Sequence, residues 1–509
     1  MRTRDCYQFS RLSFLAALML ATCGARKLPG ENLGDNGGQG TADYSVLEHH
    51  NGPVRTGVYT HPSFTRKAAS GIHLDFTTAL EGAVNAQPLF VDRRGAGSDL
   101  VLVATELNQV SAIDASTGAL IWRRQLDPPL PQQRLVDAIG PCGNMDPIGI
   151  TGTPIIDQST QQIYFDLATP DDARFGRHLV YALSLEDGST VPGWPTDVGA
   201  LVPGFRDIVQ NQRGALTILN GRVYIPYGGH AGDCADYRGW LVSISTLDPS
   251  DALAWSTAVA GAGIWGPSGV ATDAISLFVA TGNGAEVPKW MGSEGVLRLD
   301  EGPTFSGLPA DYYAPLDWLT LDLGDVDLGG SGVILVDLPK GNPSELAVAI
   351  GKDGKFYVVD RSNLGGLGGA LLAELVSGSA VTAPSAFSTV NGTFVTFSSY
   401  GGVNCTELDN IITIRINPTS PLTISPAWCA SAPGYGSTMV TNTDGMSESI
   451  VWAVGAEIDN RLFGFDGDTG ALIAVTDELG EVTHFTAPMA AKGRIYVAAE
   501  DRISAFTVK

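Results

Sequence analysis

The sequence predicts an all-β fold, an eight-bladed β-propeller of four-stranded antiparallel blades in which an N-terminal strand closes the last blade. A short β-branched or aromatic run recurs along the chain, and a hairpin segment containing Asp and Thr-Gly follows it in several copies. The composition agrees with these two patterns. The 509 residues include 62 Gly and 29 Pro, and only 17% are charged, which is typical of many turns between short strands.

The recurring run has turn residues on both sides. Its eight copies begin at Val101, Ile163, Val223, Leu277, Leu346, Phe394, Ile450 and Ile495. Successive copies are 62, 60, 54, 69, 48, 56 and 45 residues apart, and self-similarity at such periods indicates a propeller or a solenoid. No helical 3.6-residue pattern of any length lies between the runs.

A second strand, a tight turn and a third strand follow each run. The clearest copy is SAIDASTGALIW at residues 111–122, and weaker copies occupy residues 181–194, 243–255 and 463–475. Asp and Thr-Gly form the hairpin turn because Gly adopts positive φ at no steric cost. The Trp that ends the outer strand is expected to wedge between blades and to bury a large apolar area.

The two ends of the repeat region complement each other. The last copy stops at residues 506–508, one strand short, and residues 72–78 form a strand without a blade of its own. A ring leaves no open sheet edge if its ends pair, so this N-terminal strand is predicted to complete blade eight. The propeller is then expected to span residues 72–509, after a signal segment at 1–23 and a flexible tether and N-terminal arm at 24–71.

The N-terminus has the features of an export signal. Three arginines precede a short apolar stretch at residues 12–22. Residues 20–23 (LATC) resemble a bacterial lipobox, in which Cys23 is acylated and becomes the mature N-terminus. Thr22 departs from the small residue usual before that Cys, so ordinary signal cleavage nearby is the alternative. The chain is expected at a bacterial cell envelope, as an outer-membrane lipoprotein or in the periplasm, or as a secreted protein.

Four cysteines remain once Cys6 and Cys23 are set aside: Cys142, Cys234, Cys405 and Cys429. An even number in an exported chain indicates two disulfides. Cys405 and Cys429 lie 24 residues apart across one predicted hairpin and are expected to pair, which leaves Cys142 with Cys234. The alternative is free buried thiols.

The formal net charge of −23 argues against nucleic acid or an anionic membrane as a partner, because a phosphate-binding surface needs clustered Lys and Arg. After the N-terminal segment, no apolar run reaches the roughly 18 residues of a membrane span. Membrane contact is therefore expected only through a lipid anchor, and the protein is expected to be a monomer.

Several short motifs have a structural interpretation. Residues 261–266 (GAGIWG) match GxGxxG, but no helix follows, so a Gly-rich loop is expected rather than an NAD site. Residues 466–470 (DGDTG) are expected to form a hairpin turn. His49 and His50 are expected to be solvated near the tether. HExxH, CxxC, CxxCH and GxSxG do not occur, so zinc, c-type haem and serine-hydrolase chemistry have no sequence support.

The segment SAIDASTGALIW resembles the tryptophan-docking repeat of the pyrroloquinoline-quinone (PQQ) quinoproteins and of their non-enzymatic relatives, which include an outer-membrane assembly lipoprotein. The resemblance covers residues 72–509. It implies the fold more specifically than the activity, because propellers of this type include both catalysts and scaffolds.

The resemblance also implies a site. Residues 263–284 are similar to the segment of PQQ alcohol dehydrogenases that supplies a Trp floor under the quinone and an Asn ligand to calcium, here Trp265 and Asn283. Residues 326–337 are similar to the segment with the catalytic Asp, here Asp327. Residues 351–361 are similar to the segment whose basic residue contacts the quinone, here Lys352.

Residues 228–240 (GGHAGDCADYRGW) are similar to the calcium-ligating stretch of these enzymes, which precedes an Arg-Gly-aromatic element. The Glu of the family has no direct match, so Asp233 or Asp236 has to substitute as the metal ligand. Arg238, the Arg of that element, is assigned to the cofactor. The adjacent Cys-Cys pair of the dehydrogenases and a long insertion of theirs are absent.

The implied site is chemically coherent. A flat quinone needs an aromatic face, calcium needs carboxylate and amide oxygens, a carboxylate base removes the alcohol proton, and a cation stabilises the developing oxyanion. The carboxylate of Asp327 and the amide of Asn283 must then lie within about 10 Å of each other.

Two functions follow. The first is a quinoprotein-type oxidoreductase that uses PQQ and calcium on an alcohol or sugar hydroxyl, with no haem, NAD or zinc. The second is a non-catalytic, lipid-anchored propeller that binds a protein or glycan partner at the cell envelope.

Overall fold

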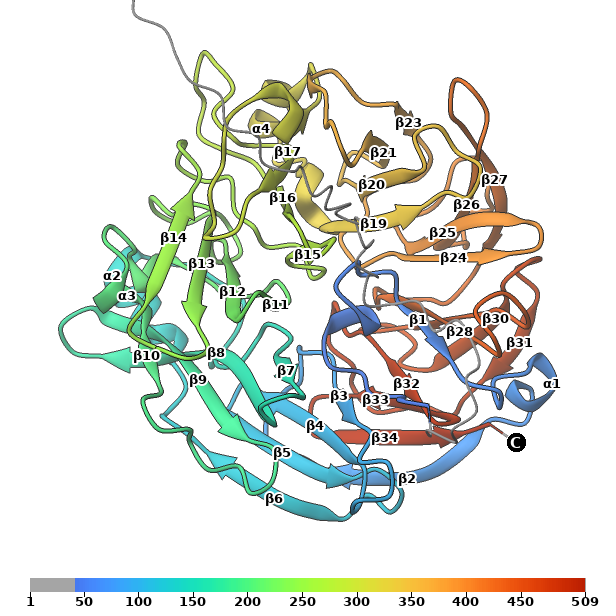
Figure 1. The fold of residues 1–509 in the computed structure, drawn as a ribbon, viewed down its shortest axis with the longest axis horizontal. Coiled ribbons are helices and arrows are strands. Elements are labelled where there is room, and N and C mark those ends of the chain that lie inside the picture. The colour runs from blue at the N-terminus through green and yellow to red at the C-terminus, as the bar shows by residue number, and fades with distance from the viewer. Residues whose placement is uncertain (1–41, 509) are drawn as a thin grey trace, which may run out of the picture. The chain divides into compact units, whose positions relative to one another are not determined.

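The computed structural model describes residues 42–508, and Figure 1 shows their fold. Eight small antiparallel sheets form a ring around a central channel, which confirms the predicted eight-bladed propeller. The predicted signal segment, the lipobox with Cys23 and most of the predicted tether lie outside the described residues. Within residues 42–508, no helix combines the length and the apolar character needed to cross a membrane.

Each of the first four blades begins with its innermost strand. The first and second blades contain β3 (Leu89–Val91), β4 (Leu100–Thr105), β5 (Gln109–Asp114), β6 (Leu120–Gln125), β7 (Ile155–Asp157), β8 (Gln162–Asp171), β9 (Phe175–Ser184) and β10 (Thr196–Asp197). The third and fourth contain β11 (Thr217–Leu219), β12 (Arg222–Tyr227), β13 (Trp240–Ser245), β14 (Ala252–Ser256), β15 (Ala271–Thr272), β16 (Leu277–Thr281), β17 (Gly295–Leu299), β18 (Tyr312–Ala314) and β22 (Gly366–Leu367).

The last four blades follow the same pattern. The fifth and sixth contain β19 (Val333–Asp337), β20 (Glu345–Ile350), β21 (Lys355–Asp360), β23 (Leu372–Leu375), β24 (Ser385–Thr389), β25 (Gly392–Ser398), β26 (Ile411–Asn417) and β27 (Thr423–Ala430). The seventh and eighth contain β1 (Val58–Thr60), β28 (Thr438–Asn442), β29 (Ile450–Val454), β30 (Leu462–Asp466), β31 (Leu472–Val475), β32 (Met489–Ala491), β33 (Arg494–Ala498), β34 (Arg502–Thr507) and β2 (His73–Ala79). All eight recurring runs of the sequence form the second strands of these blades.

Outer-strand tryptophans pack on glycines in the hairpin turn of the next blade. Trp122 of β6 donates its indole N–H to the Leu185 carbonyl at 3.1 Å, and a Cβ on Gly188 would lie 2.6 Å from its ring. Trp428 of β27 covers Gly470 of the seventh blade in the same way. The inter-blade wedge predicted for Trp122 is confirmed.

The N-terminal strand closes the ring as predicted. β2 pairs antiparallel with β34, so that His73 lies opposite Thr507 and Ala79 opposite Arg502. Phe76 of β2 packs on Gly118 in the hairpin turn of the first blade. An aromatic contact therefore joins the eighth blade to the first, as Trp122 joins the first to the second.

Residues 46–60 form an arm inside the ring. Its last three residues are β1, which lies parallel to β28 (Figure 1). Innermost strands of six blades each donate a backbone N–H to a carbonyl of the arm: Phe90 to Val46, Ile156 to Leu47, Thr272 to Pro53, Leu335 to Val54, Ala386 to Thr56 and Val440 to Gly57. The arm thus follows the inner side of the ring from the first blade to the seventh.

Arg55 fastens the arm to the third and fourth blades. Its side chain is 0% exposed. The guanidinium donates to the carbonyls of Leu216 at 2.8 Å and Val270 at 2.7 Å, and it pairs with Glu48 at 2.8 Å. Every side of this buried charge is therefore compensated, as a buried charge requires.

The expectation that His49 and His50 are solvated is wrong. Their side chains are 2% and 0% exposed because the arm lies in the channel, and their rings stack with centroids 4.2 Å apart. Burial lowers the pKa of both imidazoles, that of His50 to about 4, so both rings are neutral at pH 7.

The sequence shows no helical periodicity, yet the described chain contains short helices in the connections. They are α1 (Arg66–Ala69), α2 (Gln132–Ile139), α3 (Val198–Leu201), α4 (Trp318–Gly324), and the 3₁₀ turns η1 (His49–Asn51), η2 (Asp207–Val209), η3 (Pro309–Asp311) and η4 (Leu328–Gly330). The longest has 8 residues, about two turns, which is too few for a recurring apolar stripe.

Antiparallel order places the connections on two opposite faces of the ring. Loops that join second to third strands, and those that join one blade to the next, lie on the face called here the upper face. Turns between the other strands lie on the lower face. The arm enters at the lower face, where the Tyr44 N–H is donated to Asp92 in the β3–β4 turn at 3.2 Å. It leaves there too, since Thr60 contacts Asn442 at the end of β28.

Candidate cofactor-binding site

A cavity of about 250 Å³ lies among the upper-face loops. Four residues singled out by the sequence line it: Asp233, Trp265, Asp327 and Lys352. Asp233 comes from the β12–β13 loop, Trp265 precedes β15, Asp327 precedes β19, and Lys352 follows β20. The structure thus brings side chains of the third, fourth and fifth blades to one cavity.

The carboxylate of Asp327 is fixed from several sides. Its side chain is only 2% exposed. Oδ1 accepts the backbone N–H of Asn283 at 2.7 Å and the indole N–H of Trp265 at 3.4 Å. Oδ2 contacts the ammonium group of Lys352. Asp327 and Asn283 are therefore in direct contact, well inside the separation that the implied site requires.

Lys352 connects the Asp327 carboxylate to the Trp265 ring. Its ammonium group also pairs with Asp325 at 2.8 Å and lies 5.4 Å from the centroid of the Trp265 ring. Its backbone N–H is donated to the Asp327 carbonyl at 2.8 Å, which ties the β20–β21 loop to the segment ahead of β19. The Lys352 ammonium group, the Asp327 carboxylate and the Trp265 indole thus lie in contact with one another.

The electrostatics of this pair depend on burial. Burial raises the pKa of Asp327, and the Lys352 ammonium opposes that rise. Burial also acts to lower the pKa of Lys352, but the carboxylates of Asp327 and Asp325 outweigh it and raise this pKa above its usual value. Lys352 is consequently a permanent cation at the carboxylate in the physiological range.

Trp265 lies on a surface made of glycines. A Cβ on Gly228 would lie 3.1 Å from the Trp265 Cβ, and one on Gly330 would lie 3.5 Å from the far edge of the ring. A side chain at position 228 would press on the Trp265 Cβ, whereas a Cβ at position 330 would only reach van der Waals contact with the ring. The half-buried ring keeps its remaining surface toward the cavity.

Asn283 and Asp233 meet at the side of the cavity. The Asn283 amide N–H is donated to Asp233 Oδ2 at 3.1 Å, and Asp233 Oδ1 accepts the Tyr237 hydroxyl at 2.6 Å. Because Asn283 also contacts Asp327 through its backbone, two carboxylates and one amide gather here. Within residues 42–508 there is no group of three or more His, Cys, Asp or Glu side chains that could hold a metal ion by itself.

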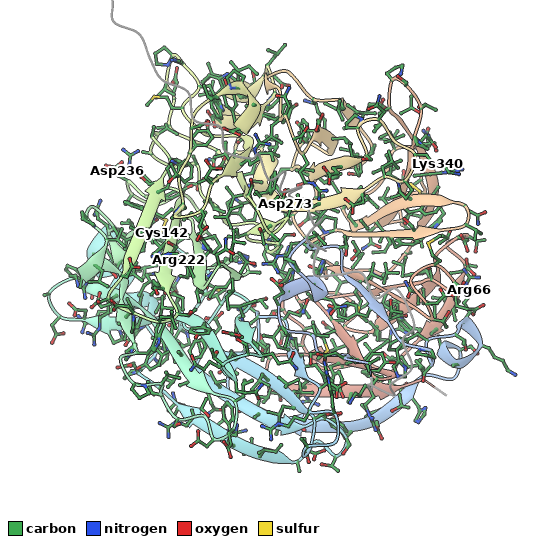
Figure 2. All side chains as sticks on the ribbon, viewed as in Figure 1. Arg66, Cys142, Arg222, Asp236, Asp273 and Lys340 are labelled. Atoms are coloured by element: carbon green, nitrogen blue, oxygen red, sulfur yellow. A yellow bond between two sulfur atoms is a disulfide. The ribbon has the colours of Figure 1, made fainter. Side chains whose placement is uncertain are left out.

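The other two residues of the calcium-like stretch lie elsewhere. Asp236 is exposed, and the view in Figure 2 places it near the outer edge of the ring. The Arg238 guanidinium is directed to the Thr257 carbonyl at 3.0 Å and does not line the cavity. The intervening Tyr237 is the member of this stretch that turns inward, because its ring packs in a small apolar cluster beside the cavity.

Both disulfides expected from the sequence are present, Cys142–Cys234 and Cys405–Cys429. The first follows directly after Asp233 and ties the β12–β13 loop to the connection between the first and second blades (Figure 2). It therefore limits the movement of the loop that supplies Asp233. The second lies within the sixth blade, away from the cavity.

Two further carboxyl groups behind Asp327 have no counterpart in the sequence prediction. Burial and the neighbouring Asp327 raise the pKa of Glu294 to about 10, so Glu294 is protonated at pH 7. Its Oε2 accepts the Leu328 N–H at 2.6 Å. Burial raises the pKa of Asp322 to about 6, and its oxygens accept hydrogen bonds from Gly284 and Ser293. No motif in the sequence indicated this cluster.

Arg213 and Phe485 are two further lining residues that the sequence did not indicate. Arg213 precedes β11 and Phe485 precedes β32, so only the ring brings them together. The guanidinium lies over the phenyl ring, 3.5 Å from its centroid. Both also line a second upper-face cavity of about 540 Å³, which extends over the first, seventh and eighth blades.

Comparison with solved structures shows which proteins share this fold. A quinohemoprotein alcohol dehydrogenase from Pseudomonas putida HK5 matches with a TM-score of 0.64 and 13% identity, over 91% of this chain and 80% of that one. A europium-containing methanol dehydrogenase matches with a TM-score of 0.62 and 12% identity, over 91% and 98%. BamB from Moraxella catarrhalis matches with a TM-score of 0.51 and 12% identity, over 86% and 99%.

These likenesses establish the fold, an eight-bladed propeller that this chain shares with the two dehydrogenases and with BamB. No family model matches the sequence, and no curated protein matches it either.

Proposed function

We propose that the upper-face cavity binds PQQ together with a calcium ion, and that the protein is an exported oxidoreductase acting on an alcohol or sugar hydroxyl. The carboxylate of Asp327 carries this proposal. It is buried, it is oriented by Asn283 and Trp265, and it contacts Lys352 inside one cavity. A fixed base beside a fixed cation is the arrangement that removal of a hydroxyl proton needs.

The donor set is compatible with both groups. The Trp265 ring offers an aromatic face to a planar quinone. Asp233, Asn283 and Asp327 would supply the hard oxygen atoms that calcium prefers. The amide oxygen and nitrogen of Asn283 exchange places by a simple flip, so the group that donates to Asp233 can present its oxygen to a cation instead.

The residues of the chain then have distinct roles. When bound, PQQ accepts the two electrons released as the substrate C–OH becomes a carbonyl. Asp327 accepts the hydroxyl proton at Oδ2, the oxygen that contacts Lys352, because Oδ1 is held by backbone and indole donors. The Lys352 ammonium group stabilises the negative charge that develops on oxygen. The Cys142–Cys234 disulfide and the Gly surface under Trp265 position these groups without contacting the substrate.

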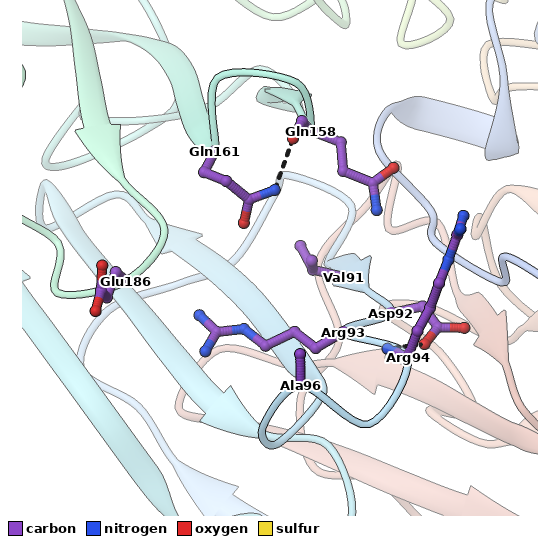
Figure 3. A pocket seen from close by; sticks show the side chains of 8 residues that line it. All are labelled: Val91, Asp92, Arg93, Arg94, Ala96, Gln158, Gln161 and Glu186. Atoms are coloured by element: carbon purple, nitrogen blue, oxygen red, sulfur yellow. Dashed lines mark hydrogen bonds between the residues drawn. The ribbon is translucent and has the colours of Figure 1, made fainter.

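A non-catalytic propeller is the second candidate, and one observation favours it. Lys352 pairs with both Asp327 and Asp325, so the chain itself supplies a counter-ion for the Asp327 carboxylate. A partner-binding protein also needs a recognition surface. The lower face has a cavity of about 540 Å³ whose lining is mostly polar: Asp92, Arg93, Arg94, Gln158, Gln161 and Glu186, with Val91 and Ala96 (Figure 3). Such side chains suit the hydroxyls of a glycan.

Titration of the full-length exported protein with PQQ and calcium chloride distinguishes the two. We expect a visible absorption band of bound quinone that requires calcium and disappears with a chelator. Trp265→Ala is expected to weaken binding about tenfold, since one aromatic face is worth roughly 1 kcal/mol or more. Trp255→Ala, which changes a half-buried outer-strand Trp, is the matched control. A wild-type protein that binds no PQQ at any calcium concentration contradicts the proposal and supports the scaffold.

A further inference from the structure

We infer that Arg213 is an anion-binding residue of the upper face, and that the ligand of this cavity carries a carboxylate that pairs with it. The inference rests on the proposed function in that the ligand tested is PQQ, a tricarboxylic acid. The argument begins with position. Arg213 lines the cavity of Asp327 and Lys352, the larger upper-face cavity, and a small space of about 10 Å³ between them and His49 of the arm.

The guanidinium of Arg213 has no partner of its own. Among residues 42–508, no hydrogen bond or ion pair reaches it, and its Nε atom is shielded from solvent with its donor unused. Only the face of the group is engaged, by stacking on Phe485 at 3.5 Å. The planar fork of donors is therefore free to point into the cavities.

Arg55 shows what a satisfied buried arginine looks like in the same channel. It pairs with Glu48 and donates to the backbone carbonyls of Leu216 and Val270. The charge and donors of Arg55 are thus paired with groups of the arm and of the ring. Arg213, which precedes β11, makes no contact of this kind among residues 42–508.

Glu106 and Glu457 act electrostatically on Arg213, but no hydrogen bond or ion pair joins either carboxylate to its guanidinium. Glu106 is buried, and its oxygens accept hydrogen bonds from Asn85 at 2.6 Å and from Gly149 at 2.7 Å. Glu457 accepts hydrogen bonds from the backbone and the ring of His484. Burial lowers the pKa of Arg213 to about 10, so the group keeps its charge at pH 7 without a contacting anion.

The charge pattern of the cavity selects the ligand class. Of the two cations in its lining, Lys352 is engaged with Asp327 and Asp325, and Arg213 is the free one. The lining of the smaller cavity also includes the neutral side chains of Asn144 and Asn211, whereas the larger cavity that Arg213 lines contains carboxyl groups, those of Glu106, Asp146, Glu457, Glu500 and Asp501. A planar guanidinium binds a carboxylate through two parallel hydrogen bonds, which a neutral sugar or simple alcohol does not provide.

The test compares PQQ with its trimethyl ester, which keeps the ring system and removes the negative charges. Binding of each compound to the full-length protein with calcium is followed by quenching of Trp fluorescence. We expect wild type to prefer the acid by tenfold to hundredfold, as charge-assisted hydrogen bonds imply. Arg213→Gln should lose this preference, because its affinity for the acid falls while its affinity for the ester stays the same. Arg213→Lys should keep part of it, and Arg206→Gln, at an exposed site nearby, should keep it fully.

Equal discrimination by wild type and Arg213→Gln overturns the inference, and melting temperatures of the variants identify any loss of folding. If wild type binds neither compound, the proposed function fails. The inference about Arg213 is then tested with citrate as the probe in place of PQQ. An increase in melting temperature with citrate in wild type and not in Arg213→Gln supports an anion site, and no increase in wild type overturns it.

Discussion

The carboxylate of Asp327 accepts the backbone N–H of Asn283 at 2.7 Å, and this hydrogen bond joins the fifth blade to the fourth. The other carboxylate oxygen faces Lys352, which follows β20. The orientation of the group is therefore set by two loops outside its own segment. A carboxylate held in this way loses little conformational entropy when a ligand arrives, which is the physical meaning of a preorganised base.

Replacing Asp327 by Asn should remove the base and keep the shape of the site. We expect kcat for PQQ-dependent alcohol oxidation to fall by about 10²- to 10⁴-fold, the usual contribution of general base catalysis. Dye-linked assays of the reconstituted protein measure this. Asp325→Asn changes the exposed carboxylate that also contacts Lys352, and it should lower kcat by less than tenfold. Comparable losses in both variants would assign the effect to Lys352 rather than to the base.

Removing the Cys142–Cys234 disulfide with a double Ser substitution should lower the free energy of unfolding by about 4 kcal/mol, since the bond closes a loop of 92 residues. It should also weaken calcium-dependent PQQ binding, because the loop with Asp233 gains freedom. The matched control is the double Ser variant of Cys405–Cys429, which closes 24 residues in the sixth blade. That variant should lose about 3 kcal/mol and keep its affinity for PQQ. Denaturant unfolding and fluorescence titration measure both effects.

Ring closure depends on Phe76 as well as on backbone pairing. Phe76→Ala should lower the free energy of unfolding by roughly 2 to 3 kcal/mol, because it empties the contact with Gly118 between the eighth and first blades. Leu74→Ala in the same strand changes a side chain that is 53% exposed, and it should have little effect. Deletion of residues 73–79 should expose the edge of β34 and cause aggregation. A deletion variant with unchanged melting temperature and solubility would exclude closure by β2.

His178 makes the stability of the second blade depend on pH. Burial acts to lower its pKa, but Asp166, whose Oδ2 lies 2.6 Å from Nδ1, and Asp207 outweigh burial and raise the pKa to about 9. A folded pKa above the unfolded value of about 6.5 gives stability that is complete below pH 6.5 and is lost as the pH rises through 9.

The melting temperature of wild type should therefore fall between pH 7 and pH 10. In His178→Gln, which is less stable throughout because Asp166 loses its partner, the fall should be smaller. Parallel curves for the two proteins over this range would mean that His178 does not titrate there. Thermal unfolding in buffers of constant ionic strength measures the difference.

The features predictable from the sequence are those encoded locally. The run at Val101 and the hairpin at residues 111–122 each contain their own strand and turn signals, so eight repetitions were enough to derive the ring. Asp327 and Lys352 could be named because each lies in a short segment with a recognisable pattern. The strand at residues 72–78 could be assigned to the last blade because that blade lacked one strand.

The features that escaped prediction depend on contacts across the ring. Arg213 and Phe485 come from loops of different blades, and neither loop has a motif. The arm is bound mostly through its backbone carbonyls, and such bonds leave no signature in side-chain pattern. The prediction for His49 and His50 was wrong for this reason. The composition of the arm is polar, but the surrounding ring buries it.

The arm enters the ring from the lower face, and the described chain also ends there, since the Val508 N–H is donated to Gly493 in the β32–β33 turn at 3.3 Å. The cavity of Asp327 and Lys352 opens among the loops of the opposite face. A bead, an electrode or a fusion protein joined at either end of residues 42–508 would therefore leave the cavity mouth facing solution. Immobilised preparations should retain full access for small ligands, whichever end is used for attachment.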